Sequence, residues 1–139
     1  MPVVAFRLNK IEGKRNDDVA LEGSLEVRSN FKILSVKKVE NDTLRVNFDF
    51  EVEYNPDVGK IEFEGYLLYQ NSNITEVIKE EDERSLTLKE DVIREISTVI
   101  IRESLIESVS VAKQLRLPVP IKLPRVSSEI PRLRFAKAS

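Results

Sequence analysis

The sequence predicts an α+β domain: a four-stranded antiparallel sheet is followed by a short and a long helix packed on one face, then by an extended proline-rich segment. Three observations predict this class. Apolar and charged residues alternate with period two between Thr43 and Gln70, which is typical of strands covered on one side. Residue pairs with helix-capping spacing follow Gln70. The last apolar stretch is then interrupted by Pro118, Pro120 and Pro124.

The alternation between Thr43 and Gln70 predicts a long antiparallel hairpin. Charged residues such as Asp49 and Glu51 separate the apolar positions, so the two faces differ. The segment Asn55–Gly59 has the residue types of a turn, because Pro fixes φ and Gly permits positive φ. The apolar positions are Leu44, Val46, Phe48, Phe50, Val52 and Tyr54, then Ile61, Phe63, Leu67 and Tyr69.

Two further strands precede the hairpin. Val4, Phe6 and Leu8 predict a first strand, and the polar run from Lys10 to Asp18 predicts a loop. Leu21–Val39 predicts a second strand with a bulge or bend near Ser29-Asn30, where the alternation loses phase.

Two helices are predicted after the hairpin. Asn73 with Glu76 opens a short acidic helix that ends at Arg84. Thr87 with Glu90 opens a longer one, which runs to about Gln114 because Pro118 stops it.

The long helix is predicted to be apolar on two sides. One face carries Val92, Ile93, Ile96, Val99 and Ile100; the other carries Ile101, Leu105, Ile106 and Val109. Such a helix is buried on both sides or kinked, here around 102–104. A small domain with one sheet has little to cover the second face, so we expect Ile101, Leu105, Ile106 and Val109 to form a homo-oligomer interface, in a dimer or tetramer.

The composition restricts the chemistry. Without Cys or His, thiolate and imidazole metal sites and Cys- or His-based catalysis are excluded. The four glycines are scattered, so no phosphate-binding loop is predicted. We therefore expect no catalytic residue, metal or cofactor, and a binding protein instead of an enzyme. No signal peptide or membrane-length apolar run is visible, which predicts a cytoplasmic protein without membrane insertion.

Charge is unevenly distributed. All acidic residues except Glu129 precede Lys113, whereas the last part of the chain is rich in Lys and Arg. We divide the chain into one domain, residues 1–125, and a basic tail, residues 126–139. Such a tail can bind nucleic acid or an acidic partner, or fold back on its own domain. Nucleic-acid binding has little support, because Phe135 is the one aromatic residue in the tail.

The predicted order of elements resembles the SecB-type protein-export chaperones and their SecB-like relatives. The stretches that carry the resemblance are "VVAFRLNKIEGKR", "LRVNFDFEVEYN", "IEFEGYLLY" and "VIIRESLIESVSVAKQLRLPVPIKLP". The resemblance implies a dimer of dimers with the helices between sheets, and apolar grooves that bind unfolded polypeptide. The basic C-terminus departs from the tail that export chaperones use to contact the translocation motor, so that contact is not implied here.

We therefore expect an ATP-independent chaperone-like protein, a SecB-like holdase or targeting factor for unfolded or partly folded clients. The alternatives are a non-enzymatic interaction subunit with one fixed protein partner, or an RNA- or ribosome-associated protein that uses the basic tail. The expected client-binding residues are Phe48, Phe50, Phe63, Tyr66, Leu117, Val119 and Leu123. For the segment from Leu117 to Leu123 the alternative is a C-terminal strap over the domain's own core.

Overall fold

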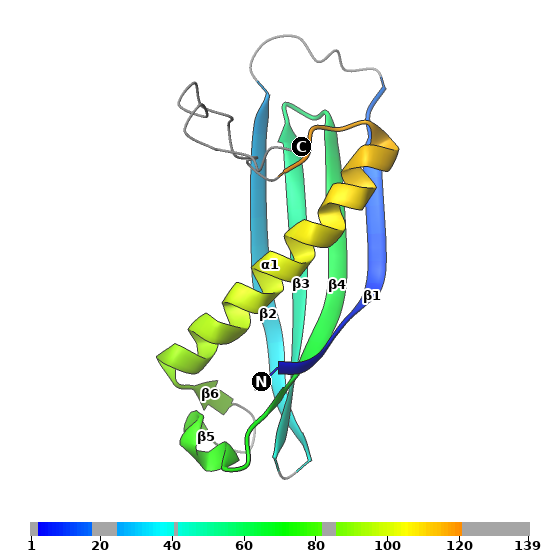
Figure 1. Cartoon of the computed structure of the whole chain (residues 1–139). Helices are drawn as coiled ribbons and strands as arrows, with labels where there is room; N and C mark the ends of the chain where they lie inside the picture. The colour runs from blue at the N-terminus through cyan, green and yellow to red at the C-terminus, as the bar shows by residue number, and fades with distance from the viewer. Residues whose placement is uncertain (1–2, 18–24, 41, 82–85, 121–139) are drawn as a thin grey trace, which may run out of the picture.

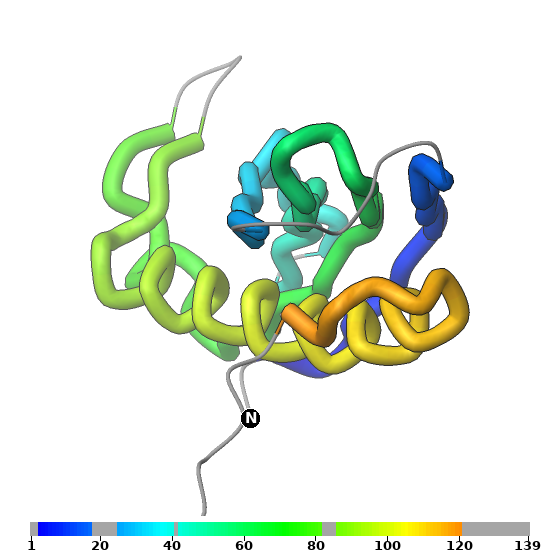
Figure 2. The backbone as a smooth tube through the Cα atoms, turned by 90° about the horizontal axis from the view of Figure 1, so that it is seen from above, coloured from blue at the N-terminus to red at the C-terminus, as the bar shows by residue number. Residues whose placement is uncertain are grey.

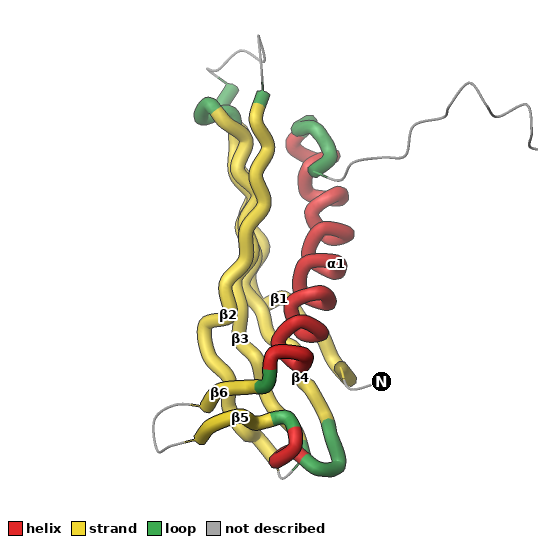
Figure 3. Tube along the Cα trace, turned by 90° about the vertical axis from the view of Figure 1, so that its left-hand side faces the viewer, coloured by secondary structure: helices red, strands yellow, loops and turns green. Residues whose placement is uncertain are grey.

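The computed structural model describes residues 3–17, 25–40, 42–81 and 86–120. Four antiparallel strands form one sheet in the order β1-β4-β3-β2, and the long helix α1 lies across one of its faces (Figures 1 and 3). The strands are β1 (Val3–Arg15), β2 (Glu26–Glu40), β3 (Thr43–Asn55) and β4 (Gly59–Gln70). The predicted four-stranded antiparallel sheet with one long helix is confirmed.

The central hairpin of β3 and β4 is confirmed. Its strands pair without interruption from Thr43 opposite Gln70 to Tyr54 opposite Gly59. The alternate residues on one face are buried beneath α1, as the period-two pattern requires. In the turn, Asp57 has φ of 52° and the Val58 amide donates to the Tyr54 carbonyl over 2.9 Å.

The first strand is longer than predicted, and the loop predicted over Lys10–Asp18 is wrong for its first part, Lys10–Arg15. β1 continues to Arg15, which pairs with Gly59. A register shift lies between Leu8 and Lys10, so the side chains that face α1 change phase after Leu8 and resume at Ile11. Because of this one-residue shift, the second half of the strand does not continue the alternation of the first half, and the sequence pattern alone does not indicate it.

The second strand is confirmed, but its irregularities lie elsewhere than predicted. β2 pairs with β3 continuously through Ser29 and Asn30, and its register shifts lie between Ile33 and Ser35 and between Lys38 and Glu40. The predicted break near Ser29-Asn30 is therefore wrong. The apolar phase changes after Ile33, where the extra residue of the bulge is accommodated.

The predicted short helix over 73–84 is wrong. The structure has a single 3-10 turn, Ile74–Glu76, followed by a small hairpin of β5 (Ile78–Glu81) and β6 (Leu86–Leu88). Asn73 makes no capping hydrogen bond. The hairpin lies beside β2, where Lys38 Nζ is 2.9 Å from Glu81 Oε2 (Figure 2). Burial of apolar side chains against the main core has overridden the local capping pattern.

Helix α1 (Glu90–Leu115) is one continuous helix across residues 102–104. Thr87 lies in β6 and so does not cap it; the N-cap is Lys89, which makes no side-chain capping bond. At the other end, the Leu117 amide donates to the Ala112 carbonyl and the Arg116 amide to the Lys113 carbonyl. These two bonds form a Schellman motif, with Arg116 in the left-handed conformation at φ of 54°.

The helix crosses the sheet diagonally, from beside β2 at its first turn to above β1 at its last (Figure 1). This path divides the core into two clusters. The first core cluster contains Val46, Phe48 and Leu67 with the first half of α1. The second core cluster contains Phe50, Val52, Tyr54, Val58, Ile61, Phe63, Ala112 and Leu117. No helix among the described residues is long and apolar enough to cross a membrane.

Candidate peptide-binding surface

Three of the predicted client-binding aromatic residues lie together in the core. Phe48, Phe50 and Phe63 are all buried between the sheet and α1. The rings of Phe50 and Phe63 stack with centroids 6.0 Å apart. A client can contact Phe48 and Phe50 only if α1 moves away from the sheet. Their role as client contacts therefore stays a prediction.

Tyr66 is not gathered with these aromatic residues, because it lies on the opposite face of the sheet. There the guanidinium carbon of Arg45 lies 3.9 Å from the centre of its ring, which is a cation–π contact. Tyr66 therefore contacts a charged surface that α1 does not cover.

The proline-rich segment supplies one buried and one half-buried client candidate. Leu117 is buried in the second core cluster, and Val119 is half-buried. Leu123 lies outside the described residues, as does the predicted basic tail 126–139.

The residues predicted for the oligomer interface lie along the second half of α1. Ile101 and Ile106 are exposed, and Leu105 and Val109 are half-buried. Leu105 also packs against the second core cluster within the same chain. An apolar outer surface on this part of the helix is therefore present, and its role in association stays a prediction.

A groove runs between α1 and β1, with a volume of about 260 Å³; we call it the α1–β1 groove. Its apolar lining includes Ile11, Val111 and Leu115, with Phe63 at the sheet, and Glu107, Ser110 and Gln114 are polar lining residues. Ile11 is 56% exposed. Sequence reasoning missed this groove because Ile11 fell in the segment assigned to a loop.

Gly13 sets how closely α1 approaches β1 in this groove. A Cβ at Gly13 would lie 2.7 Å from side-chain carbons of both Val111 and Leu115, closer than such contacts occur. The missing side chain thus lets the last turns of α1 lie directly on the strand. The result is a groove in which apolar side chains of α1 and β1 lie close together, with polar side chains of α1 beside them.

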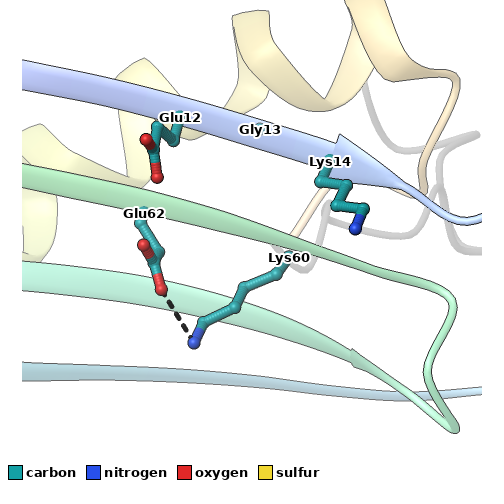
Figure 4. A pocket seen from close by; sticks show the side chains of 5 residues that line it. All are labelled: Glu12, Gly13, Lys14, Lys60 and Glu62. Carbon is teal, nitrogen blue, oxygen red and sulfur yellow. Dashed lines mark ion pairs between the residues drawn. The ribbon is translucent and has the colours of Figure 1, made fainter.

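A larger hollow of about 500 Å³ lies on the other face of the sheet and is lined by charged residues (Figure 4). Lys60 Nζ lies 2.8 Å from Glu62 Oε1 and 3.3 Å from Glu51 Oε2. The hydrogen bonds to Glu62 and then Glu51 raise the pKa of Lys60 to about 12, and the bond from Lys60 lowers the pKa of Glu62. Both groups therefore stay charged near neutral pH and are poorly suited to exchange protons with a substrate.

Within the described ranges, no group of three or more acidic side chains could hold a metal ion. Two of the hollows in the described part of the chain thus differ in character: the α1–β1 groove is largely apolar, and the hollow on the other face is lined by solvent-exposed ion pairs.

Comparison with known proteins identifies the fold. No family profile matches the sequence, and no curated protein matches it. Among solved structures, the chain is similar to the SecB-like chaperone Rv1957 of Mycobacterium tuberculosis, in complex with a ChAD peptide from the Rv1956 HigA1 antitoxin. The TM-score is 0.62 at 16% identity, over 90% of this chain and 88% of that one. The chain has a SecB-like fold. The predicted resemblance is confirmed at this level, and an export role is not part of what the likeness shows.

Proposed function

We propose that this SecB-like protein is an ATP-independent chaperone that holds unfolded or partly folded polypeptides. The observation that carries the proposal is the α1–β1 groove on a fold shared with a chaperone that binds an antitoxin peptide. Apolar side chains from both α1 and β1 line the groove and Ile11 is exposed in it, which suits an extended chain that presents aliphatic or aromatic side chains.

Recognition of this kind is tolerant of sequence. Burial of apolar side chains is non-directional, and pairing with a peptide backbone asks little of side-chain identity. The polar residues Glu107, Ser110 and Gln114 on the lining of the groove can bond the backbone of a bound segment. Such a site binds many clients weakly and releases them without a nucleotide.

The first test is suppression of the aggregation of a chemically unfolded protein. We expect suppression at both low and high salt, because burial of apolar surface is not screened by ions. Binding through the basic tail to RNA would instead weaken steeply with salt, because it depends on phosphate contacts. Absence of suppression at both salt concentrations would refute the chaperone proposal.

The site is tested by Ile11→Asp, which places a charge in the groove. We expect the apparent affinity for the unfolded client to fall by at least about tenfold, since burying one apolar side chain of this size contributes about 1.5–3 kcal/mol. Affinity can be measured by fluorescence anisotropy of a labelled client.

The matched control is Leu34→Asp. Leu34 is also 56% exposed and also lies in an edge strand, but it sits in a bulge of β2 at the opposite edge of the sheet. We expect this variant to bind the client as the wild type does. Equal losses in the two variants would show that the groove is not the binding site.

A second candidate is an interaction subunit with one fixed partner. It is favoured by the structural neighbour, whose bound peptide comes from one antitoxin. The two candidates differ in client range: a general chaperone suppresses aggregation of several unrelated unfolded proteins, and a dedicated subunit does not.

A further inference from the structure

The segment that follows α1 lies across the end of the sheet as an extended strap. We call Leu117–Pro120 the C-terminal strap. In Figure 1 it runs from the end of α1 back over the ends of β4 and β3. The prolines hold Leu117 and Val119 in extended conformations, because the residue before a proline is disfavoured in the helical region.

The strap is anchored by one side chain and one backbone group. The Leu117 side chain is 5% exposed and packs in the second core cluster with Tyr54, Val58 and Ile61. Its methyl carbon Cδ1 would lie 3.0 Å from a Cβ at Gly59, so the absence of a side chain there makes room for it. One residue further, the Tyr54 hydroxyl donates to the Pro118 carbonyl over 2.7 Å.

The turn that precedes the strap is held separately. Nη1 of Arg15, at the end of β1, donates to the Leu115 carbonyl at 3.2 Å and to the Arg116 carbonyl at 2.9 Å. These bonds, together with the bond from the Arg116 amide to the Lys113 carbonyl, hold the end of α1 without a contribution from the Leu117 side chain. The strap can therefore leave the sheet without unwinding the helix.

The position that receives the strap has the chemistry of a peptide subsite. It takes one aliphatic side chain into an apolar slot, formed by Tyr54, Val58, Gly59, Ile61 and Ala112, and bonds the next carbonyl of an extended chain. We propose that this slot is a client-binding subsite which the chain's own strap occupies in cis. This inference rests on the proposed chaperone function and adds a means of regulating it.

Competition follows from this arrangement. A tethered segment competes at a high effective concentration, so a client gains the slot only in the fraction of molecules whose strap is released. Weakening the strap while leaving the slot intact should therefore raise client affinity. If Leu117 were itself a client contact, the same change would lower it.

The decisive variant is Leu117→Ala in the full chain, measured with a carboxymethylated, permanently unfolded client protein. We expect binding at least about fivefold tighter than that of the wild type, because the free slot becomes more populated. The matched control is Leu88→Ala, which removes the same atoms from a side chain that is 4% exposed in the first core cluster. We expect no increase in client affinity for Leu88→Ala. This variant also destabilises the protein, but it leaves the C-terminal strap intact.

Unchanged or weaker binding by Leu117→Ala would overturn the inference, as would an equal increase in Leu88→Ala. If Leu117→Ala does not fold, Pro118→Gly replaces it: Pro118 is exposed, and glycine favours the released strap by freeing the backbone. The same increase is expected there, and its absence overturns the inference.

A second probe separates this inference from the chaperone proposal. The free peptide LRLPVP, which has the sequence of residues 115–120, should bind Leu117→Ala at least about fivefold more tightly than it binds the wild type. The peptide LRSPVP should bind neither protein. Should all variants fail to hold the unfolded client, the chaperone proposal falls, and LRLPVP alone decides whether the slot accepts an extended apolar segment. Equal binding of LRLPVP to both proteins, or none, overturns the inference.

Discussion

At the scale of single residues, Arg116 has a conformation that its side chain disfavours. It ends α1 with φ of 54°, the left-handed position where glycine is usual. The left-handed conformation destabilises the folded state by about 1–2 kcal/mol for an L-residue, and glycine avoids this cost. Glycine also loses more conformational entropy on folding, which offsets about 0.5–1 kcal/mol of that gain. Arg116→Gly should therefore raise the free energy of unfolding by about 0.5–1 kcal/mol.

Urea unfolding followed by circular dichroism checks this value. Arg116→Ala is the control, because alanine keeps the unfavourable φ and so should give no gain. Both variants lack the Arg116 side chain, so the difference between them reports the backbone alone. A lower stability for Arg116→Gly than for Arg116→Ala would therefore contradict this account.

At the scale of elements, α1 packs on β1 and β4 through small residues in its second half. Ser104, Ser108 and Ala112 are all buried, one turn apart. The Ser108 hydroxyl donates to the Leu105 carbonyl over 2.6 Å. In the part of the chain that the structure describes, the buried Ser104 hydroxyl has no hydrogen-bond partner.

Ser104→Ala should therefore stabilise the protein by about 1 kcal/mol, since an unpaired buried hydroxyl costs about 1–3 kcal/mol and alanine favours the helix. Ser108→Ala loses a hydrogen bond and should gain less. Thermal unfolding of the two variants side by side gives the comparison, and a larger gain for Ser108→Ala would contradict this account.

The elements differ in how far the sequence predicts them. The β3–β4 hairpin was predictable because each strand alternates without a bulge. The second half of β1 was not, because a one-residue register shift breaks the alternation after Leu8. The β5–β6 hairpin was not either, because its strands are short and depend on burial against the main core, a tertiary effect that outweighs capping signals.

The candidate site was predicted only in part, for a related reason. The alternation in the sequence predicts the apolar face of the sheet. The diagonal path of α1 decides which side chains of that face a client can contact. Phe50 is covered, whereas Ile11 is open to the groove. The resumed alternation of Ile11 with Gly13 was the signal in the sequence that could have indicated the groove.

At the scale of the whole molecule, the exposed apolar residues on the second half of α1 are the reason why we expect a partner subunit. Ile101 is 37% exposed and Ile106 is also exposed, so the monomer leaves apolar surface in water on the side of the helix away from the sheet. We expect a stable dimer or tetramer in light scattering, with a mass that falls only on strong dilution.

Ile101→Asp should dissociate this oligomer, because a buried unpaired charge is costly at an interface. Ile93→Asp is the matched control: Ile93 is 38% exposed on the same helix, but outside the predicted interface. A monomeric wild type would refute the expectation and leave the outer face of α1 without a partner.

The strand order also bears on how the chain is made. β1 leaves the ribosome first, yet Val3 pairs with Tyr69 and Arg15 with Gly59, so its neighbour β4 emerges only after β2 and β3. Until β4 has been made, β1 has no strand with which to pair. Helix α1, which covers β1, is made later still. During its own synthesis, then, the protein exposes for a time an unpaired strand whose apolar side chains, such as Phe6 and Leu8, have no cover yet.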